Sequence, residues 1–368
     1  MKNKIYKYFF HEFIRYFTIV LFAISTILWT VQAVNFLDLV TNDGHAFAIY
    51  FYYSLLTVPK ILTKLIPFTF LVALMMTILK FEKDNELIVL WTSGLNKIHL
   101  VNHIFKISIL IMFFQLTMSS LINPQTLNYS RNLIKDSKLQ FVPSLLKEKQ
   151  FNDTVEFLTI FVDKKNEDGT YSGIFIRDEG KVLTDISTGS STIFAKSGYV
   201  TPDESNLILM DGNIQKLETD KSISVIKFEK TSINLSGLDT KTISEPKIQE
   251  TSTIKLLRCI KTKCIDDNKN FSNYKIEINK RFGMPIFIPL LALIVCFLLS
   301  LNRNNKNFDF NKYLYFAIGL IIIVFSEIAV RYSGASWQNA TIYYFFPILL
   351  LPLIYFILIK KFKYENLV

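Results

Sequence analysis

Pairs of titratable residues spaced four apart have the types and the spacing that could do chemistry in this sequence. Glu82 and Glu86 have this spacing, and so do His99 and His103. Residues four apart share one face of a helix. The acidic pair suits contact with a partner protein, and the histidine pair could bind a metal ion. No third ligand accompanies the histidines, so we expect no metal site and no cofactor.

Two basic residues with the same spacing, Lys60 and Lys64, lie at the predicted outer end of an apolar segment. Arg331 lies at the predicted outer end of a second apolar segment. We predict that these three cations contact lipid phosphates and that Glu327 lies one turn deeper. A charge inside the bilayer is costly and usually pairs or faces a cavity. The alternative is a self-contained Glu327–Arg331 pair with lysines that extend to the membrane surface.

A further pair, Glu277 and Arg281, precedes Pro285 and an apolar segment. We interpret it as a hinge between the central part of the chain and the following span. Neither Ser93 nor Ser333 has partners for nucleophilic catalysis. No G-x-x-x-x-G-K-[ST] loop is present, so we expect no enzyme activity, and nucleotide chemistry would have to come from another protein.

The elements that position these residues are long apolar runs at both ends of the chain, which is 50% hydrophobic. About 20 apolar residues are needed to cross a bilayer as a helix. The fold class predicted is therefore an α-helical polytopic membrane protein with six transmembrane helices. A shorter helix at the membrane surface is expected over 45–58, because Pro59 and Pro67 interrupt a run too long for one span. The spans are predicted at 13–33, 60–79, 100–122, 281–301, 313–330 and 342–359.

The net charge of +10 belongs to the parts around these spans. Residues 123–275 hold 22 Lys and Arg against 21 Asp and Glu, whereas the rest holds 19 against 10. A nucleic-acid-binding protein more often concentrates positive charge on a soluble face, so we expect no nucleic-acid partner. The positive-inside rule predicts that both termini are cytoplasmic and that the central domain is periplasmic.

The central region contains short β-branched and apolar runs separated by turn signals, which predicts an inserted all-β, jelly-roll-like domain. Asp211-Gly212 is interpreted as a hairpin turn. An apolar interior would let acyl chains pass, but ordinary core packing explains the same residues. The candidates are Val155, Phe157, Ile174 and Ile176. Cys259 and Cys264 could form a disulfide if this region is extracytoplasmic.

The segment 82–95, between the second and third spans, predicts a short amphipathic helix. Asp84 or Asn85 would cap its start, and Gly94 suits its end. Leu87 and Leu90 would lie on the apolar side. Such a helix could dock into a groove of a soluble motor protein, or it could simply lie at the membrane surface.

The run from 59 to 95, above all Asn85-Glu86-Leu-Ile-Val-Leu-Trp-Thr-Ser-Gly94, resembles the LptF/LptG (YjgP/YjgQ) permeases of the lipopolysaccharide exporter. The arrangement of three spans, a periplasmic β-jelly roll and three spans also matches, so the resemblance covers nearly the whole chain. The Trp-Thr and Asn-x-Leu-Asp residues that begin at Trp29 look closer to LptF. Trp91-Thr92-Ser93 departs from the smaller, Ala-rich stretch that is usual there.

This resemblance implies a permease subunit in the inner membrane that lifts lipopolysaccharide out of the bilayer, an outer-membrane biogenesis step. Its implied partners are an LptB-like ATPase dimer, an LptG-like (or LptF-like) permease, an LptC-like periplasmic bridge and membrane lipids. Glu86 would insert into the ATPase groove, supported by Glu82, Leu87, Leu90 and Gly94. The domains would be 1–122, 123–275 and 276–368. The alternative function is a membrane-anchored periplasmic sensor or scaffold.

Overall fold

The structure, a computed structural model, confirms a polytopic architecture with an inserted β domain. Within the part of the chain that it describes, six helical segments are long and apolar enough to cross a membrane. They are Lys4–Asn35, Phe47–Lys83, Lys97–Ile134, Phe271–Ser300, Asp309–Tyr332 and Trp337–Lys363. The described residues are 2–37, 40, 47–136, 146–153, 157–166, 168–179, 190–201, 206–217, 222–234, 247–262, 268–300 and 308–365. Val155 and Cys264, singled out from the sequence, lie outside them.

The chain divides into two compact units. The helical unit comprises Met1–Val31, Leu56–Asn128 and Lys247–Val368, and the sheet unit comprises Gln32–Leu55 and Tyr129–Pro246. The segment that returns from the sheet, including the helix over Thr253–Thr262, therefore belongs with the helical unit.

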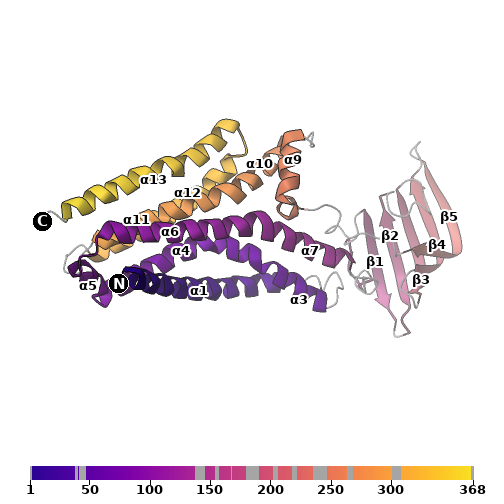
Figure 1. The fold of residues 1–368 in the computed structure, drawn as a ribbon. Coiled ribbons are helices and arrows are strands. Elements are labelled where there is room, and N and C mark those ends of the chain that lie inside the picture. Colours follow the sequence, from indigo (N-terminus) through magenta and orange to yellow (C-terminus); the bar gives the residue numbers. More distant parts are fainter. Residues whose placement is uncertain are drawn as a thin grey trace. The chain divides into compact units, whose positions relative to one another are not determined.

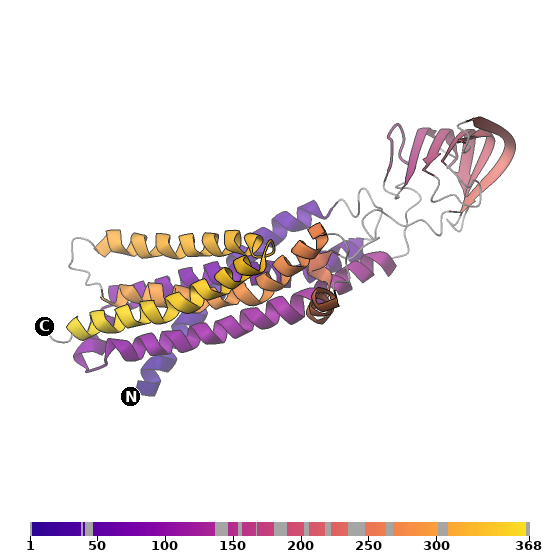
Figure 2. The same ribbon diagram turned by 90° about the horizontal axis from the view of Figure 1, so that it is seen from above.

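Long helices form the helical unit (Figures 1 and 2). At one end lie the short helix α5 and both ends of the described chain, and at the other end lies α9 (Figure 1). The elements that belong wholly or partly to this unit are α1 (Lys2–Asn35), α4 (Val58–Lys83), α5 (Glu86–Thr92), α6 (Lys97–Thr117), the π-helical turn η1 (Met118–Ile122), α7 (Asn123–Asp136), the 3-10 turn η2 (Ile248–Glu250), α9 (Thr253–Thr262), α10 (Asn268–Gly283), η3 (Met284–Ile286), α11 (Phe287–Cys296), η4 (Phe297–Ser300), α12 (Phe308–Tyr332) and α13 (Trp337–Glu365).

The core of this unit surrounds α11, whose ten residues are all buried. A helix that is apolar on every side is expected to be enclosed by other helices. By contrast, α12 exposes Ile321, Val324 and Ile328 to its surroundings. Apolar side chains on the outside of the bundle suit contact with lipid tails, because the hydrocarbon region contains no water.

The sheet unit contains α3 (Phe47–Leu56) and five antiparallel strands. A break at Thr57 separates α3 from α4, close to the end predicted for the surface helix. The strands are β1 (Leu158–Lys165), β2 (Tyr171–Asp178), β3 (Ser191–Val200), β4 (Asn206–Leu217) and β5 (Ile223–Asn234).

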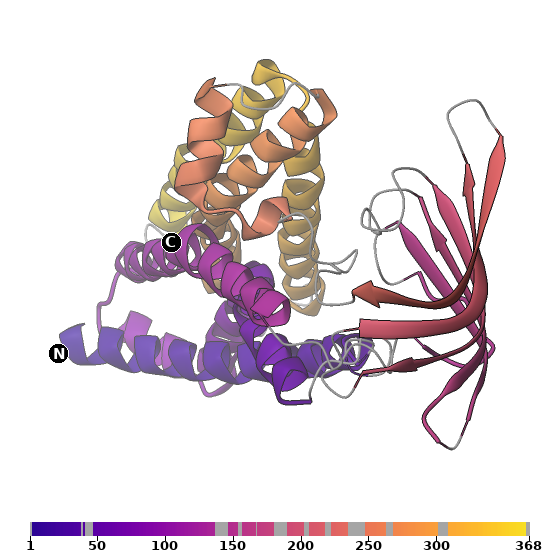
Figure 3. The same cartoon turned by 90° about the vertical axis from the view of Figure 1, so that its right-hand side faces the viewer.

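These strands pair in chain order, β1-β2-β3-β4-β5, and form one curved sheet (Figure 3). Within the described residues this is a meander, whereas a jelly roll has two sheets and strands that cross between them. Turn residues and alternation mark where strands begin and end, but they do not specify which strands pair. The buried face of the sheet includes Ile174 and Ile176.

The hairpin predicted at Asp211-Gly212 is wrong, because β4 continues through it. Asp211 has a φ of 51°, a left-handed conformation that Asp tolerates. A side chain at Gly212 would meet the carbonyl oxygen of Phe194 at 2.2 Å and the ring of Phe228 at 2.4 Å. The Asp-Gly pair therefore serves close packing across three strands and not a change of direction.

Candidate functional site

A cavity of about 330 Å³ lies inside the helical unit. It brings together Lys60 and Lys64 from α4 with Glu327 from α12, as the sequence pattern suggested. Arg331 is exposed and does not line the cavity. Within the described residues, Glu327 and Arg331 do not form the self-contained ion pair considered as the alternative.

A proline shapes the wall of this cavity. Pro67 has no N–H, so the carbonyl of Thr63, four residues earlier, lacks its helical donor. The side chain of Gln115 on α6 supplies the missing donor, with Nε2 at 3.3 Å from the Thr63 oxygen. The other end of the amide, Oε1 of Gln115, is buried without a hydrogen-bond partner. Gln115 is also one of the residues that line the cavity, so its amide adds a polar group to this wall.

Positive charge predominates on the cavity walls. Arg281 and Glu277 form an ion pair of 2.9 Å, so their charges offset each other. The other cations are Lys60, Lys64 and Lys280, which make no ion pair among the described residues, and they face one further acid, Glu327. Lys280 was not predicted from the sequence, because only the packing of α10 against α12 and η1 brings it to this cavity.

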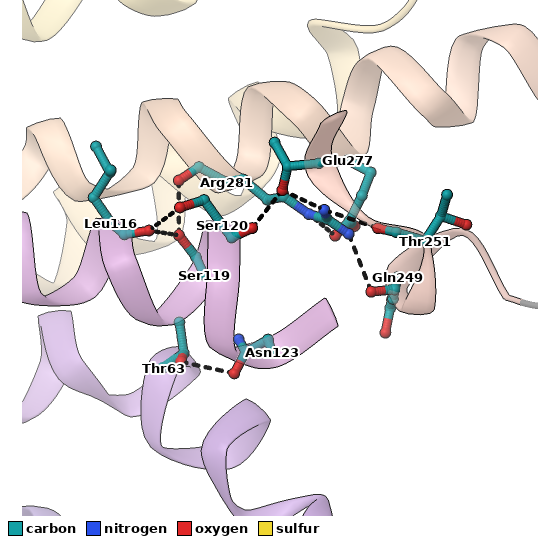
Figure 4. A network of polar contacts seen from close by, with 10 residues as sticks. Thr63, Leu116, Ser119, Ser120, Asn123, Gln249, Thr251, Glu277 and Arg281 are labelled. Carbon is teal, nitrogen blue, oxygen red and sulfur yellow. Dashed lines mark hydrogen bonds and ion pairs between the residues drawn. The ribbon is translucent and has the colours of Figure 1, made fainter. Parts of the chain in front are cut away.

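Beside the cavity, Arg281 holds together segments that are distant in the chain (Figure 4). Its side chain is 3% exposed and donates to Glu277 Oε1 at 2.9 Å and to the backbone oxygens of Gln249 and Thr251 at 3.0 Å each. It also donates to the Thr253 hydroxyl at 2.8 Å. The guanidinium thus fixes η2 and the start of α9 to α10, and the hinge predicted at this pair stays a prediction.

Two hydroxyl groups extend this network to the third span. The Ser119 hydroxyl donates to the backbone oxygen of Arg281 at 2.9 Å (Figure 4). The Thr253 hydroxyl donates to the backbone oxygen of Ser120. Both serines lie in the π-helical turn η1, a distortion that occurs frequently at functional sites. Neither the adjacent Ser119 and Ser120 at the end of an apolar run nor Thr253 in a polar segment gave a sequence signal for these contacts.

At the opposite end of the helical unit, α5 presents Glu86 and an apolar patch. Leu87 is buried and anchors the helix, whereas Ile88 and Val89 are 50% and 63% exposed. Glu86 accepts a hydrogen bond of 3.2 Å from the Tyr8 hydroxyl of α1. The predicted docking helix therefore has an acid at its first residue and two exposed apolar residues at its third and fourth positions.

Two details of this segment differ from the prediction. Glu82 belongs to the last turn of α4, where it is buried, so it does not share the exposed face of α5. Neither Asp84 nor Asn85 caps α5 with its side chain; Asn85 adopts a left-handed φ of 59° that turns the chain between the two helices. The chain reverses direction between α4 and α5 because Asn tolerates a left-handed backbone conformation. The side-chain oxygen of Asn85 does not cap α5.

Gly94 ends α5 as predicted. Its φ is 80°, which a residue without Cβ adopts at little cost. The N–H of Gly94 bonds to the Trp91 oxygen and the N–H of Leu95 bonds to the Leu90 oxygen, both at 3.1 Å. These two bonds and the buried Leu95 make a Schellman motif, which holds Leu90 and Trp91 against the core.

Together, the fold and these two sites define a multi-pass membrane protein with an inserted antiparallel β domain, a basic cavity and an exposed acidic-apolar helix. The chain belongs to the LptF/LptG family: the family model described as lipopolysaccharide export system permease LptF/LptG matches residues 7–361. An uncharacterized protein of Rickettsia prowazekii (strain Madrid E) is 27% identical over 233 residues. That alignment covers 63% of this chain and 63% of the relative, so it spans less than two thirds of either protein.

Proposed function

We propose that this chain is a permease subunit of a lipopolysaccharide exporter. It would extract lipopolysaccharide from the inner membrane and pass it to a periplasmic bridge, using ATP hydrolysed by a partner. The observation that carries the proposal is the match to the LptF/LptG family over residues 7–361. The chain itself contains no G-x-x-x-x-G-K-[ST] loop, which is consistent with hydrolysis by a separate subunit.

The exposed face of α5 supports an ATPase partner at that end of the bundle. Ile88 and Val89 are large exposed apolar side chains, and Val89 lies one turn after Glu86 on α5. An apolar anchor with an adjacent charge suits insertion into a groove that carries a basic residue. We therefore assign α5 to an LptB-like ATPase dimer, with Leu87, Leu90 and Gly94 holding it in place and Glu82 supporting it from α4.

The cavity supports a ligand that is anionic and carries hydroxyl groups. Lys60, Lys64 and Lys280 suit phosphate groups. The polar side chains of the same wall, which include Gln115, Ser119 and Asn123, suit sugar hydroxyl groups. A phosphorylated glycolipid headgroup meets both requirements. Apolar members of the same wall, including Phe287 and Leu291, suit the acyl chains.

The remaining assignments of this proposal follow from the family and from the charge distribution. The partners are an LptG-like permease, if this chain is closer to LptF, and an LptC-like bridge. Both termini and α5 would be cytoplasmic, and the β domain would be periplasmic, by the positive-inside rule. The domain division of 1–122, 123–275 and 276–368 and an acyl path along the sheet belong to the same proposal.

The coupling assignment is tested by co-purification of an ATPase with the tagged full chain. Glu86→Ala should lower ATPase recovery at least about tenfold, since a charge pair at an interface contributes about 1.5 kcal/mol or more. Asp309→Ala is the matched control, because this exposed carboxylate pairs with Lys312 of its own helix. Absence of any ATPase from the wild-type preparation, or full recovery with Glu86→Ala, would favour a scaffold over a transporter.

The lipid assignment is tested with a variant that removes both cavity lysines of α4. Lys60→Gln/Lys64→Gln should reduce lipopolysaccharide release to a periplasmic acceptor while ATPase recovery stays unchanged. Arg331→Gln should keep release, because Arg331 lies outside the cavity. Normal release by the double variant would remove the cavity from the transport path, and a loss with Arg331→Gln alone would favour the cation cluster predicted from the sequence.

A further inference from the structure

The helix α9 carries an apolar surface that the described structure leaves uncovered. Its buried face contains Thr253, Leu256 and Cys259. Next to this face, Ile254 and Leu257 are 71% and 48% exposed. These two residues are three apart, so they extend the buried face along one side of the helix.

A basic stripe runs beside the exposed apolar residues. Lys255, Arg258 and Lys261 are three apart from one another and exposed, and α9 contains no acidic residue. A helix with an apolar side next to a Lys- and Arg-rich side is typical of helices that lie in the headgroup region of a membrane.

The position of α9 fits the level of the headgroups. From Arg281 inward, the next charged residue in the sequence is Arg303. The 20 residues from 281 to 300 rise about 30 Å as a helix, the thickness of the hydrocarbon core. Arg281 therefore marks the membrane boundary. Its bond to Thr253, and the bond from Thr253 to Ser120, hold the start of α9 at that level.

The direction of α9 fits as well. The long helices run together along the bundle, whereas α9 crosses their direction at its end (Figures 1 and 2). A helix across the spans lies in the plane of the membrane.

We propose that α9 is an interfacial helix that binds anionic phospholipid next to the Arg281 network. Ile254 and Leu257 enter the boundary of the acyl region, and the basic stripe contacts phosphate groups. Each Lys or Arg near an anionic membrane surface strengthens binding roughly fivefold. The lipid is a component of the surrounding bilayer and not the transported molecule, so the inference holds whether or not the chain exports lipopolysaccharide.

The test uses the full chain in vesicles of equimolar phosphatidylglycerol and phosphatidylcholine. Leu257→p-benzoylphenylalanine is photoactivated, and lipid adducts on the peptide that contains position 257 are identified by mass spectrometry. We expect adducts of both lipids, with phosphatidylglycerol in excess by roughly fivefold or more. In the same background, Lys255→Gln/Arg258→Gln/Lys261→Gln should bring the ratio close to one.

Two control variants separate lipid binding from folding and from total charge. The variant Lys255→Arg/Arg258→Lys/Lys261→Arg keeps the charges and should keep the excess. The variant Lys164→Gln/Lys196→Gln/Lys227→Gln removes three exposed charges from the sheet and should also keep it. Adducts to protein instead of lipid, no adduct, or an excess that survives loss of the basic stripe would each overturn the proposal.

Discussion

Arg281→Met tests whether one buried guanidinium holds the return segment to the helical unit. The substitution keeps the apolar stem of the side chain and removes the guanidinium with every donor that it carries. It leaves the Glu277 carboxylate, the Thr253 hydroxyl oxygen and two backbone oxygens without their partner. Removing one member of a buried ion pair costs about 3–5 kcal/mol.

The lower end of that range applies here. The backbone oxygens belong to Gln249 and Thr251, which are not buried and which water can reach after the substitution. We therefore expect the opening free energy of the segment 248–262 to fall by about 3 kcal/mol, which corresponds to roughly a 100-fold change in equilibrium.

Hydrogen exchange followed by mass spectrometry measures this opening in the full chain. Amides of η2 and α9 should lose protection by about two orders of magnitude in Arg281→Met, while amides of α11 should keep it. Lys280→Met is the matched control, because Lys280 makes no ion pair among the described residues. Equal protection in wild type and Arg281→Met, or an equal loss in Lys280→Met, would refute the argument.

Three further predictions concern other parts of the molecule. Gly94→Ala should destabilise the end of α5 by about 1–2 kcal/mol, because φ is 80° although space for a methyl is free, and faster amide exchange in α5 would show it. Glu12→Gln should weaken the 2.7 Å contact with Lys80 and lower stability by about 1–2 kcal/mol in thermal unfolding, and no change would show that the contact is not stabilising. The Thr170 hydroxyl and N–H, which both donate to Asp168, hold the pKa of this carboxyl below its ordinary value. Thr170→Val should therefore raise the pKa of Asp168 in an NMR titration. In the unsubstituted protein, the stability that these hydrogen bonds contribute is present above the unfolded pKa of about 3.9 and is lost as pH falls through the folded pKa.

The membrane spans were predictable because each depends on a local property. A run of about 20 apolar residues is costly to expose to water wherever it occurs, so 13–33 and 313–330 lie in α1 and α12. The end of α5 was predictable for a similar reason, since Gly94 satisfies a local backbone requirement.

The cavity depended on packing between distant segments. The spacing of Lys60 and Lys64 indicated a shared helix face, but only the tertiary structure adds Lys280 and Gln115 and leaves out Arg331. The role of Pro67 shows why. A proline in a sequence indicates a missing N–H, whereas the side chain that replaces this donor comes from a helix about fifty residues away.

The same division applies to the whole chain. The sequence by itself determined the number of spans, the inserted β domain, the exposed acidic helix and the family resemblance, because these rest on hydropathy, turn residues and one contiguous motif. Tertiary structure decided that β4 continues through Asp211-Gly212, that Glu82 is buried, and that Arg281 joins η2, α9 and α10. Each of these depends on which distant groups meet a given backbone or side chain, and no local pattern specifies that meeting.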